Sequence, residues 1–116
     1  MKINAEKSIV KEWLGTLNEA AKGKHYPKLW KRVYGLVAVP TRRRHSVNLS
    51  KLDRNTKTGD NVVVPGKVLS SGAIKHKINI SAMEYSESAL KSLREADCKI
   101  LSIKEMLNSE KVRVII

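Results

Sequence analysis

The sequence is poor in cysteine, the residue whose disulfides and metal sites stabilise very small proteins. It also has no segment able to cross a membrane. It contains one cysteine in 116 residues, and no apolar run approaches the roughly 18 residues that a spanning helix needs. A single cysteine excludes an intrachain disulfide framework and a cysteine-rich zinc site. The first seven residues carry no apolar core of a secretory signal. We therefore expect a soluble, cytoplasmic protein with no membrane partner.

Aromatic and acidic residues are also scarce. Aromatic residues make up 4% of the chain, and 11 acidic residues face 23 lysines and arginines, which gives a net charge of +12 and a pI near 10.0. Small soluble domains usually carry a net charge of about 2–8. Because 41% of the residues are hydrophobic, the chain is expected to be globular and not disordered. A small basic domain of this kind predicts a polyanionic partner, with nucleic acid first.

The positive charge is concentrated in the first half of the chain. Residues 1–58 hold 14 basic and 4 acidic residues, a net charge of +10, whereas residues 59–116 hold 9 and 7, a net charge of +2. Two alternatives stay open, a basic surface without a partner and attachment to a membrane surface. The size of the charge disfavours the first. The second needs an exposed apolar helix face, and we expect that face to lie in the core.

Residues 1–39 are predicted to form a helical hairpin. Apolar residues recur at helical spacing over 3–22, and Gly23 is placed to end that helix. A second helix is expected to begin at Pro27, because proline is favoured in a first helical turn, and to stop at Pro40.

Residues 40–61 are predicted to be a basic loop region. The segment opens with three consecutive arginines, 42–44, among polar residues. A short strand is expected at 47–49, a turn of helix at 50–56, and a tight turn at 58–61.

Residues 62–116 are predicted to form an α/β core. Strands are expected at 62–64, 67–69, 78–83, 100–101 and 112–116, with a break at Pro65–Gly66. Ser86 is expected to cap a helix that runs to Ala96, and Ser102 with Glu105 forms a capping box for a helix over 103–109. Alternating strands and helices predict a small, mostly parallel sheet with crossover helices. The fold class is therefore α/β, a single domain with an N-terminal helical hairpin.

Residue patterns for catalysis or metal binding are missing. No pair among His25, His45 and His76 has metal-ligand spacing. Cys98 follows the end of a predicted helix, where no dipole would stabilise a thiolate, so a small half-buried residue is expected. The glycines around Lys67 do not have the spacing of a phosphate-binding loop. We predict no enzyme activity, no cofactor, no metal and no small-molecule substrate.

Patterns for nucleic-acid binding are stronger. Arginine triplets can grip phosphates bidentately, and lysines three apart on a helix share one face. Basic clusters separated along the chain but joined by tight turns suit a folded RNA. A DNA-binding reading of the helical hairpin remains the alternative, with Lys28, Lys31 and Arg32 in a groove. The predicted RNA-binding residues are Arg42, Arg43, Arg44, Lys51, Arg54, Lys57, Lys67, Lys75, His76 and Lys77.

Two stretches resemble the signature of a known family. Residues 40–52 (PTRRRHSVNLSKL) and 59–72 (GDNVVVPGKVLSSG) are similar to segments of the archaeal and eukaryotic large-subunit ribosomal protein family called L-eighteen-e, a relative of bacterial L-fifteen. The order of the remaining elements also follows that family, and the length fits its compact archaeal form. Two positions depart from the family pattern. Thr41 stands where relatives often carry a basic residue, and Ser70 replaces a common glycine.

The resemblance implies a structural component of the large ribosomal subunit that binds large-subunit rRNA beside neighbouring ribosomal proteins. It implies an α/β fold and no catalytic activity. By this resemblance Asn48 and Ser50 would serve either the local backbone or a polar RNA contact. A basic DNA-binding or chromatin-like protein is the alternative function. The residues that would contact rRNA by the same resemblance are Arg42, Arg43, Arg44, Lys51, Arg54 and Lys67.

Overall fold

The computed structural model describes residues 2–24, 26–38, 46–109 and 111–116, with side chains described from residue 9 onward. The chain divides into two compact units, residues 1–44 and residues 45–116.

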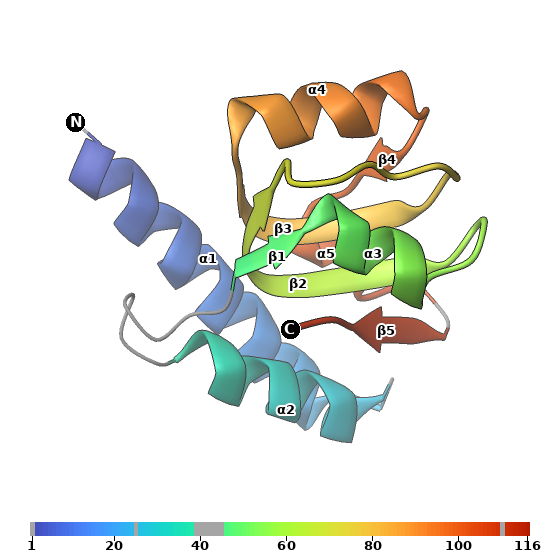
Figure 1. Ribbon diagram of the computed structural model, residues 1–116. Helices are drawn as coiled ribbons and strands as arrows, with labels where there is room; N and C mark the ends of the chain where they lie inside the picture. The colour runs from blue at the N-terminus through green and yellow to red at the C-terminus, as the bar shows by residue number, and fades with distance from the viewer. Residues whose placement is uncertain (1, 25, 39–45, 110) are drawn as a thin grey trace. The chain divides into compact units, whose positions relative to one another are not determined.

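The first unit is a pair of helices, α1 (Lys2–Lys22) and α2 (Pro27–Val37), which pack against each other (Figure 1). Helix α2 begins at Pro27 as predicted. It ends at Val37, where the N–H of Ala38 donates to the Tyr34 carbonyl at 2.9 Å. The predicted stop at Pro40 lies outside the described residues. The helical hairpin is confirmed, and its buried apolar residues are Trp13, Leu17, Trp30, Val33 and Val37.

The second unit is a five-stranded sheet in which every strand pair is parallel, as the alternation of strands and helices predicted. Strand β3 lies along one edge of the central strand β2, and β4 pairs with β3. The other edge of β2 is shared, because β5 pairs with residues 61–63 and β1 with residues 67–69. The strands are β1 (Ser46–Asn48), β2 (Asn61–Leu69), β3 (Asn79–Tyr85), β4 (Lys99–Ile100) and β5 (Val112–Val114).

Strand β2 corrects one prediction. The break expected at Pro65–Gly66 is wrong, because β2 runs without interruption from Asn61 to Leu69 and buries both residues. The irregularity appears instead as a register shift against β3 between Val64 and Lys67. A bulge of this kind accommodates a proline, which has no N–H to donate, and a glycine within a strand.

Helices pack on both faces of the sheet. A continuous apolar core joins Leu49 and Leu52 of α3 (Leu49–Asn55), Ala89 and Leu93 of α4 (Glu87–Glu95), and Val62 of β2. Side chains alternate along β2 and β3, so Val63 and its register partner Ser81 point to the opposite face. On that face α5 (Ile103–Met106) lies against β3.

The helix starts of the second unit follow the predicted capping chemistry. The N–H of Ala89 donates to Ser86 Oγ at 3.1 Å at the start of α4. At the start of α5, Ser102 and Glu105 form both hydrogen bonds of a capping box. Each cap satisfies backbone donors that the helix leaves open. None of the described helices is long and apolar enough to span a membrane.

Candidate nucleic-acid interface

Helix α3 presents two of the predicted RNA-binding residues on its outer face. Leu49 and Leu52 are fully buried and three residues apart, which turns Lys51 and Arg54 outward, where both are exposed. Lys51 Nζ donates to the carbonyl oxygen of Ile116, and Arg54 Nε donates to the Ser50 carbonyl at 3.3 Å. Both cations keep further donors for a ligand.

The start of α3 is joined to the crossover segment, residues 70–78, which connects β2 to β3. The N–H of Ser50 donates to the Ser71 carbonyl at 3.1 Å. Gly72 has φ of +84°, and a Cβ built on it would lie 2.5 Å from Ser50 Cβ. Only glycine fits both this backbone conformation and this close approach. The junction therefore joins the two stretches that resemble the ribosomal family, through Ser50 of the first and Ser71 and Gly72 of the second.

Asp53 fastens the middle of the crossover segment to α3. Its Oδ1 accepts a hydrogen bond from the Lys75 N–H at 2.9 Å and lies 3.3 Å from His76 Nδ1. His76 Nε2 lies 2.7 Å from Thr56 Oγ1, and the Thr56 hydroxyl also lies 2.6 Å from the Leu52 carbonyl. His76 therefore points inward, with its side chain 19% exposed. Its RNA contact stays a prediction, whereas its position between Asp53 and Thr56 gives it a role in the fold.

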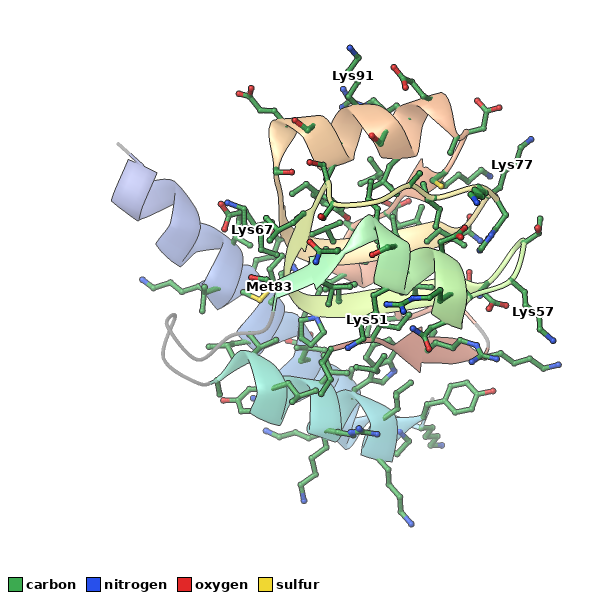
Figure 2. The ribbon with its side chains drawn as sticks, in the orientation of Figure 1. Lys51, Lys57, Lys67, Lys77, Met83 and Lys91 are labelled. Carbon is green, nitrogen blue, oxygen red and sulfur yellow. The ribbon has the colours of Figure 1, made fainter. Side chains whose placement is uncertain are left out.

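The turn after α3 is tied to the same segment. The N–H of Gly59 donates to the Lys77 carbonyl at 2.8 Å, and the N–H of Lys57 donates to Asp60 Oδ2 at 2.8 Å. These bonds bring the exposed side chains of Lys57 and Lys77 to one end of the second unit, as Figure 2 shows.

These contacts form one basic surface, which we call the α3 surface. Both of its acidic side chains make contacts within the second unit. Asp53 accepts a hydrogen bond from the crossover segment, and Asp60 accepts one from the Lys57 N–H and pairs with Arg113. No other acidic residue lies in the segments 49–60 and 70–78. Five exposed cations outnumber these two carboxylates, so the surface keeps a net positive charge and its potential favours a polyanion. The exposed cations of the α3 surface are Lys51, Arg54, Lys57, Lys75 and Lys77.

The other predicted RNA-binding residues are not part of the α3 surface. Lys67 Nζ is 3.5 Å from Glu84 Oε1, and the two side chains are 41% and 56% exposed. An exposed pair of this kind contributes roughly 0–1 kcal/mol and exchanges readily with another anion. Figure 2 shows Lys67 at the end of the unit away from Lys57 and Lys77. The arginines at 42–44 lie outside the described residues.

Arg113 is a basic residue that the sequence patterns did not single out. Strand β5 pairs with the start of β2 and places Arg113 Nε 3.3 Å from Asp60 Oδ2, with the arginine side chain 57% exposed. The two residues are far apart in the sequence. Only the β2–β5 pairing brings them together, so no local signal could have found this contact.

Two titratable groups of the second unit have raised pKa values, and both belong to its interior. Burial raises the pKa of Tyr85 to about 12, although the Ala82 N–H donates to its hydroxyl oxygen at 2.9 Å. Burial likewise raises the pKa of the Cys98 thiol, whose Sγ lies 3.6 Å from the His76 carbonyl oxygen. A buried thiol with a raised pKa is a poor nucleophile. In the part of the chain that the structure describes, no group of three or more His, Cys, Asp or Glu could hold a metal ion.

The chain is similar to ribosomal proteins of archaea. It is 40% identical over 91 residues to the large ribosomal subunit protein eL18 of Archaeoglobus fulgidus, which covers 78% of this chain and 76% of the relative. It is 38% identical over 80 residues to that of Methanoregula boonei (69% and 66%), and 37% identical over 83 residues to that of Sulfurisphaera tokodaii (72% and 70%). No protein-family model matches the chain.

Proposed function

Since this chain belongs to the eL18 family of large ribosomal subunit proteins, we propose that it is a structural, non-catalytic constituent of the cytoplasmic large subunit. We propose further that it binds large-subunit rRNA through its α3 surface. The observation that carries the proposal is the α3 surface itself. Five exposed cations converge from one helix and two loops, while both nearby acidic side chains have internal partners.

Binding of this kind needs phosphate contacts and no chemistry. Each cation that neutralises a phosphate releases condensed counterions, so affinity falls as salt rises. The arginines at 42–44 are proposed to add to the same interaction, because planar guanidinium groups hold phosphates bidentately. With about 6–10 phosphates engaged, the affinity for an rRNA fragment should fall by about 10³–10⁵ between 50 and 200 mM salt, on the scale of duplex DNA. Neighbouring large-subunit proteins are proposed as further contacts of the assembled protein.

The test measures the affinity of the full chain for a large-subunit rRNA transcript across a salt series. The variant Lys51→Ala, Lys57→Ala, Lys77→Ala should bind more weakly and lower the salt slope by about 2–3, since each phosphate contact contributes roughly 0.7–0.9.

A matched control removes the same charge from other parts of the second unit. Lys91 on α4, Lys99 on β4 and Lys104 on α5 are exposed, and Figure 2 shows Lys91 far from Lys51 and Lys57. The variant with alanine at these three positions should keep most of the affinity and the slope. Equal losses in the two triple variants would show that only net charge matters and would contradict a built surface.

The arginine triplet is tested separately. Replacing residues 42–44 by alanine should weaken rRNA binding and leave the circular-dichroism spectrum and the thermal midpoint unchanged. A collapsed spectrum would show that these arginines hold the fold. Preference for duplex DNA over the rRNA transcript in the wild-type chain would instead support the DNA-binding alternative.

A further inference from the structure

Helix α2 carries a second basic surface that the α3 surface does not include. The helix buries Trp30, Val33 and Val37, and its lysine and arginine side chains all lie on the exposed side. Those residues are Lys28, Lys31 and Arg32. Spacings of three and four residues place them on one face of the helix. The segment 26–38 contains no acidic residue, so nothing within it offsets the three charges.

A glycine, Gly35, extends the face that these charges form. Gly35 follows Lys31 and Arg32 by four and three residues, which places it one turn further along the same face. It is exposed, and a Cβ built on it would meet no atom within 4 Å. Its φ is not in the left-handed region. Packing and backbone conformation therefore do not require glycine here, although glycine is among the least favourable residues in a helix.

A ligand that approaches the helix backbone would require glycine at this position. Without a Cβ, the helix has a shallow bare site with three cations in the turns before it, and a chain of phosphates can lie against this face. A protein partner would be expected to use an apolar anchor at the centre of its interface. Here the face itself holds a glycine and three cations, and the exposed Tyr34 adjoins it three residues after Lys31. The chemistry of this face therefore fits a nucleic-acid backbone better than a protein surface.

We propose that the exposed face of α2, formed by Lys28, Lys31, Arg32 and Gly35, binds the sugar–phosphate backbone of an rRNA segment in addition to the segment held by the α3 surface. This inference rests on the proposed function, because it takes the polyanion to be rRNA. It goes beyond that function by assigning a binding role to the first unit and by giving Gly35 a role in contact with the ligand.

The decisive experiment compares two glycines. Gly15 on α1 is also exposed, and a Cβ on it would also meet no atom within 4 Å. In the full chain, Gly35→Gln and Gly15→Gln should each raise the thermal midpoint by about 2–5 °C, because glutamine is the better helix former. Affinity for a large-subunit rRNA transcript should fall about 3–10-fold in G35Q and stay unchanged in G15Q. A gain in stability together with a loss of affinity is not expected from a glycine that serves only the fold.

A variant that removes the three charges tests the RNA-binding role of the α2 face in a second way. Lys28→Ala, Lys31→Ala and Arg32→Ala together should lower the salt slope of rRNA binding by about 2–3, as expected for three lost phosphate contacts. Alanine preserves the helix, so the circular-dichroism spectrum should not change. Combined with the α3-surface triple variant, the losses in log affinity should add, because the two sets of residues lie in different units.

The outcomes separate the two proposals. If the wild-type chain shows no salt-dependent binding to the rRNA transcript, the proposed function fails and this inference fails with it. If the wild type binds, the α3-surface variant weakens binding, and both G35Q and the α2 triple variant bind like the wild type, only this inference is overturned. That result would leave the α2 face to a neighbouring protein.

Discussion

Residues 1–44 hold eleven basic and three acidic residues, whereas residues 45–116 hold twelve basic and eight acidic ones. In the first unit, the described basic face of α2 is set by helix periodicity alone, and three cations share it within five residues. In the second unit, the α3 surface depends on hydrogen bonds between segments about twenty residues apart. Positive charge is therefore presented by the periodicity of a single helix in the first unit and by tertiary structure in the second.

The difference predicts how each surface fails. A surface set by one helix should survive any substitution that leaves the helix intact. A surface built from a helix and two loops should be lost when a contact beneath it is removed, even if every cation remains. In the second unit, substitutions that remove contacts beneath the α3 surface are therefore expected to weaken rRNA binding even where every cation is kept.

The largest effect is expected for Val63→Asp. Val63 is fully buried in the central strand, and an unpaired buried carboxylate costs several kcal/mol, here about 4 or more. Urea denaturation followed by circular dichroism should show loss of the folded second unit. The exposed substitution Ser88→Asp adds the same charge near the start of α4 and should change the free energy of unfolding by less than about 1 kcal/mol. A wild-type transition in V63D would mean that this strand is not the core.

The next effect is expected for Gly72→Ala. The new Cβ would clash with Ser50, and the residue would have to keep φ of +84°, so the cost should be about 2–4 kcal/mol. Gly59→Ala is the matched control. Its φ is +88° but its surroundings are open, and it should cost only about 1 kcal/mol. Chemical denaturation gives both values, and equal costs would show that the Ser50 contact is not required.

A smaller effect is expected for His76→Ala. The substitution removes the contacts of the imidazole to Asp53 and Thr56, which should lower the free energy of unfolding by about 1–2 kcal/mol. Binding of rRNA should also weaken, because the crossover segment carries Lys75 and Lys77. Wild-type stability together with weakened binding would show instead that the imidazole contacts RNA directly, as the sequence predicted.

The smallest effect is expected for Tyr85 at alkaline pH. The unfolded tyrosine loses its proton near pH 10, whereas the folded one keeps it until its pKa of about 12. The folded state therefore binds more protons in this window, and its stability falls as pH rises from 10 to 12. At pH 11 the loss should be about 1 kcal/mol, and Tyr85→Phe should remove it. Denaturation midpoints of the two proteins at pH 8 and pH 11 measure the difference, and an equal fall in both would assign the loss to other groups.

Much of the fold could be predicted because its signals are local. Proline at the start of α2, the Ser86 cap and the Ser102–Glu105 capping box each act within a few residues, and the structure confirms all three. The uninterrupted course of β2 through Pro65 and Gly66 was not predictable in the same way. Proline has no N–H, so whether it ends a strand or sits in a bulge depends on whether a neighbouring strand needs a donor at that position, and that is set by the whole sheet.

The residues of the candidate site also differ in whether local or long-range signals determine their positions. Exposure of Lys51 and Arg54 followed from helix spacing, and the structure places both on the outer face of α3. The inward position of His76 did not follow, because its partner Thr56 lies 20 residues away. A histidine between two lysines looks like part of a basic cluster until the fold shows what it contacts.

The shared edge of β2 also bears on how the protein folds during synthesis. The edge at residues 61–63 is paired by residues 112–114, which leave the ribosome long after β2 has been made. Until then, hydrogen-bonding groups along that stretch of a buried strand have no partner, and an open edge of this kind can pair with another chain. Parallel pairing over such long sequence separations also slows folding. Between the synthesis of β2 and that of β5, this protein therefore has an open strand edge through which it can associate with other chains.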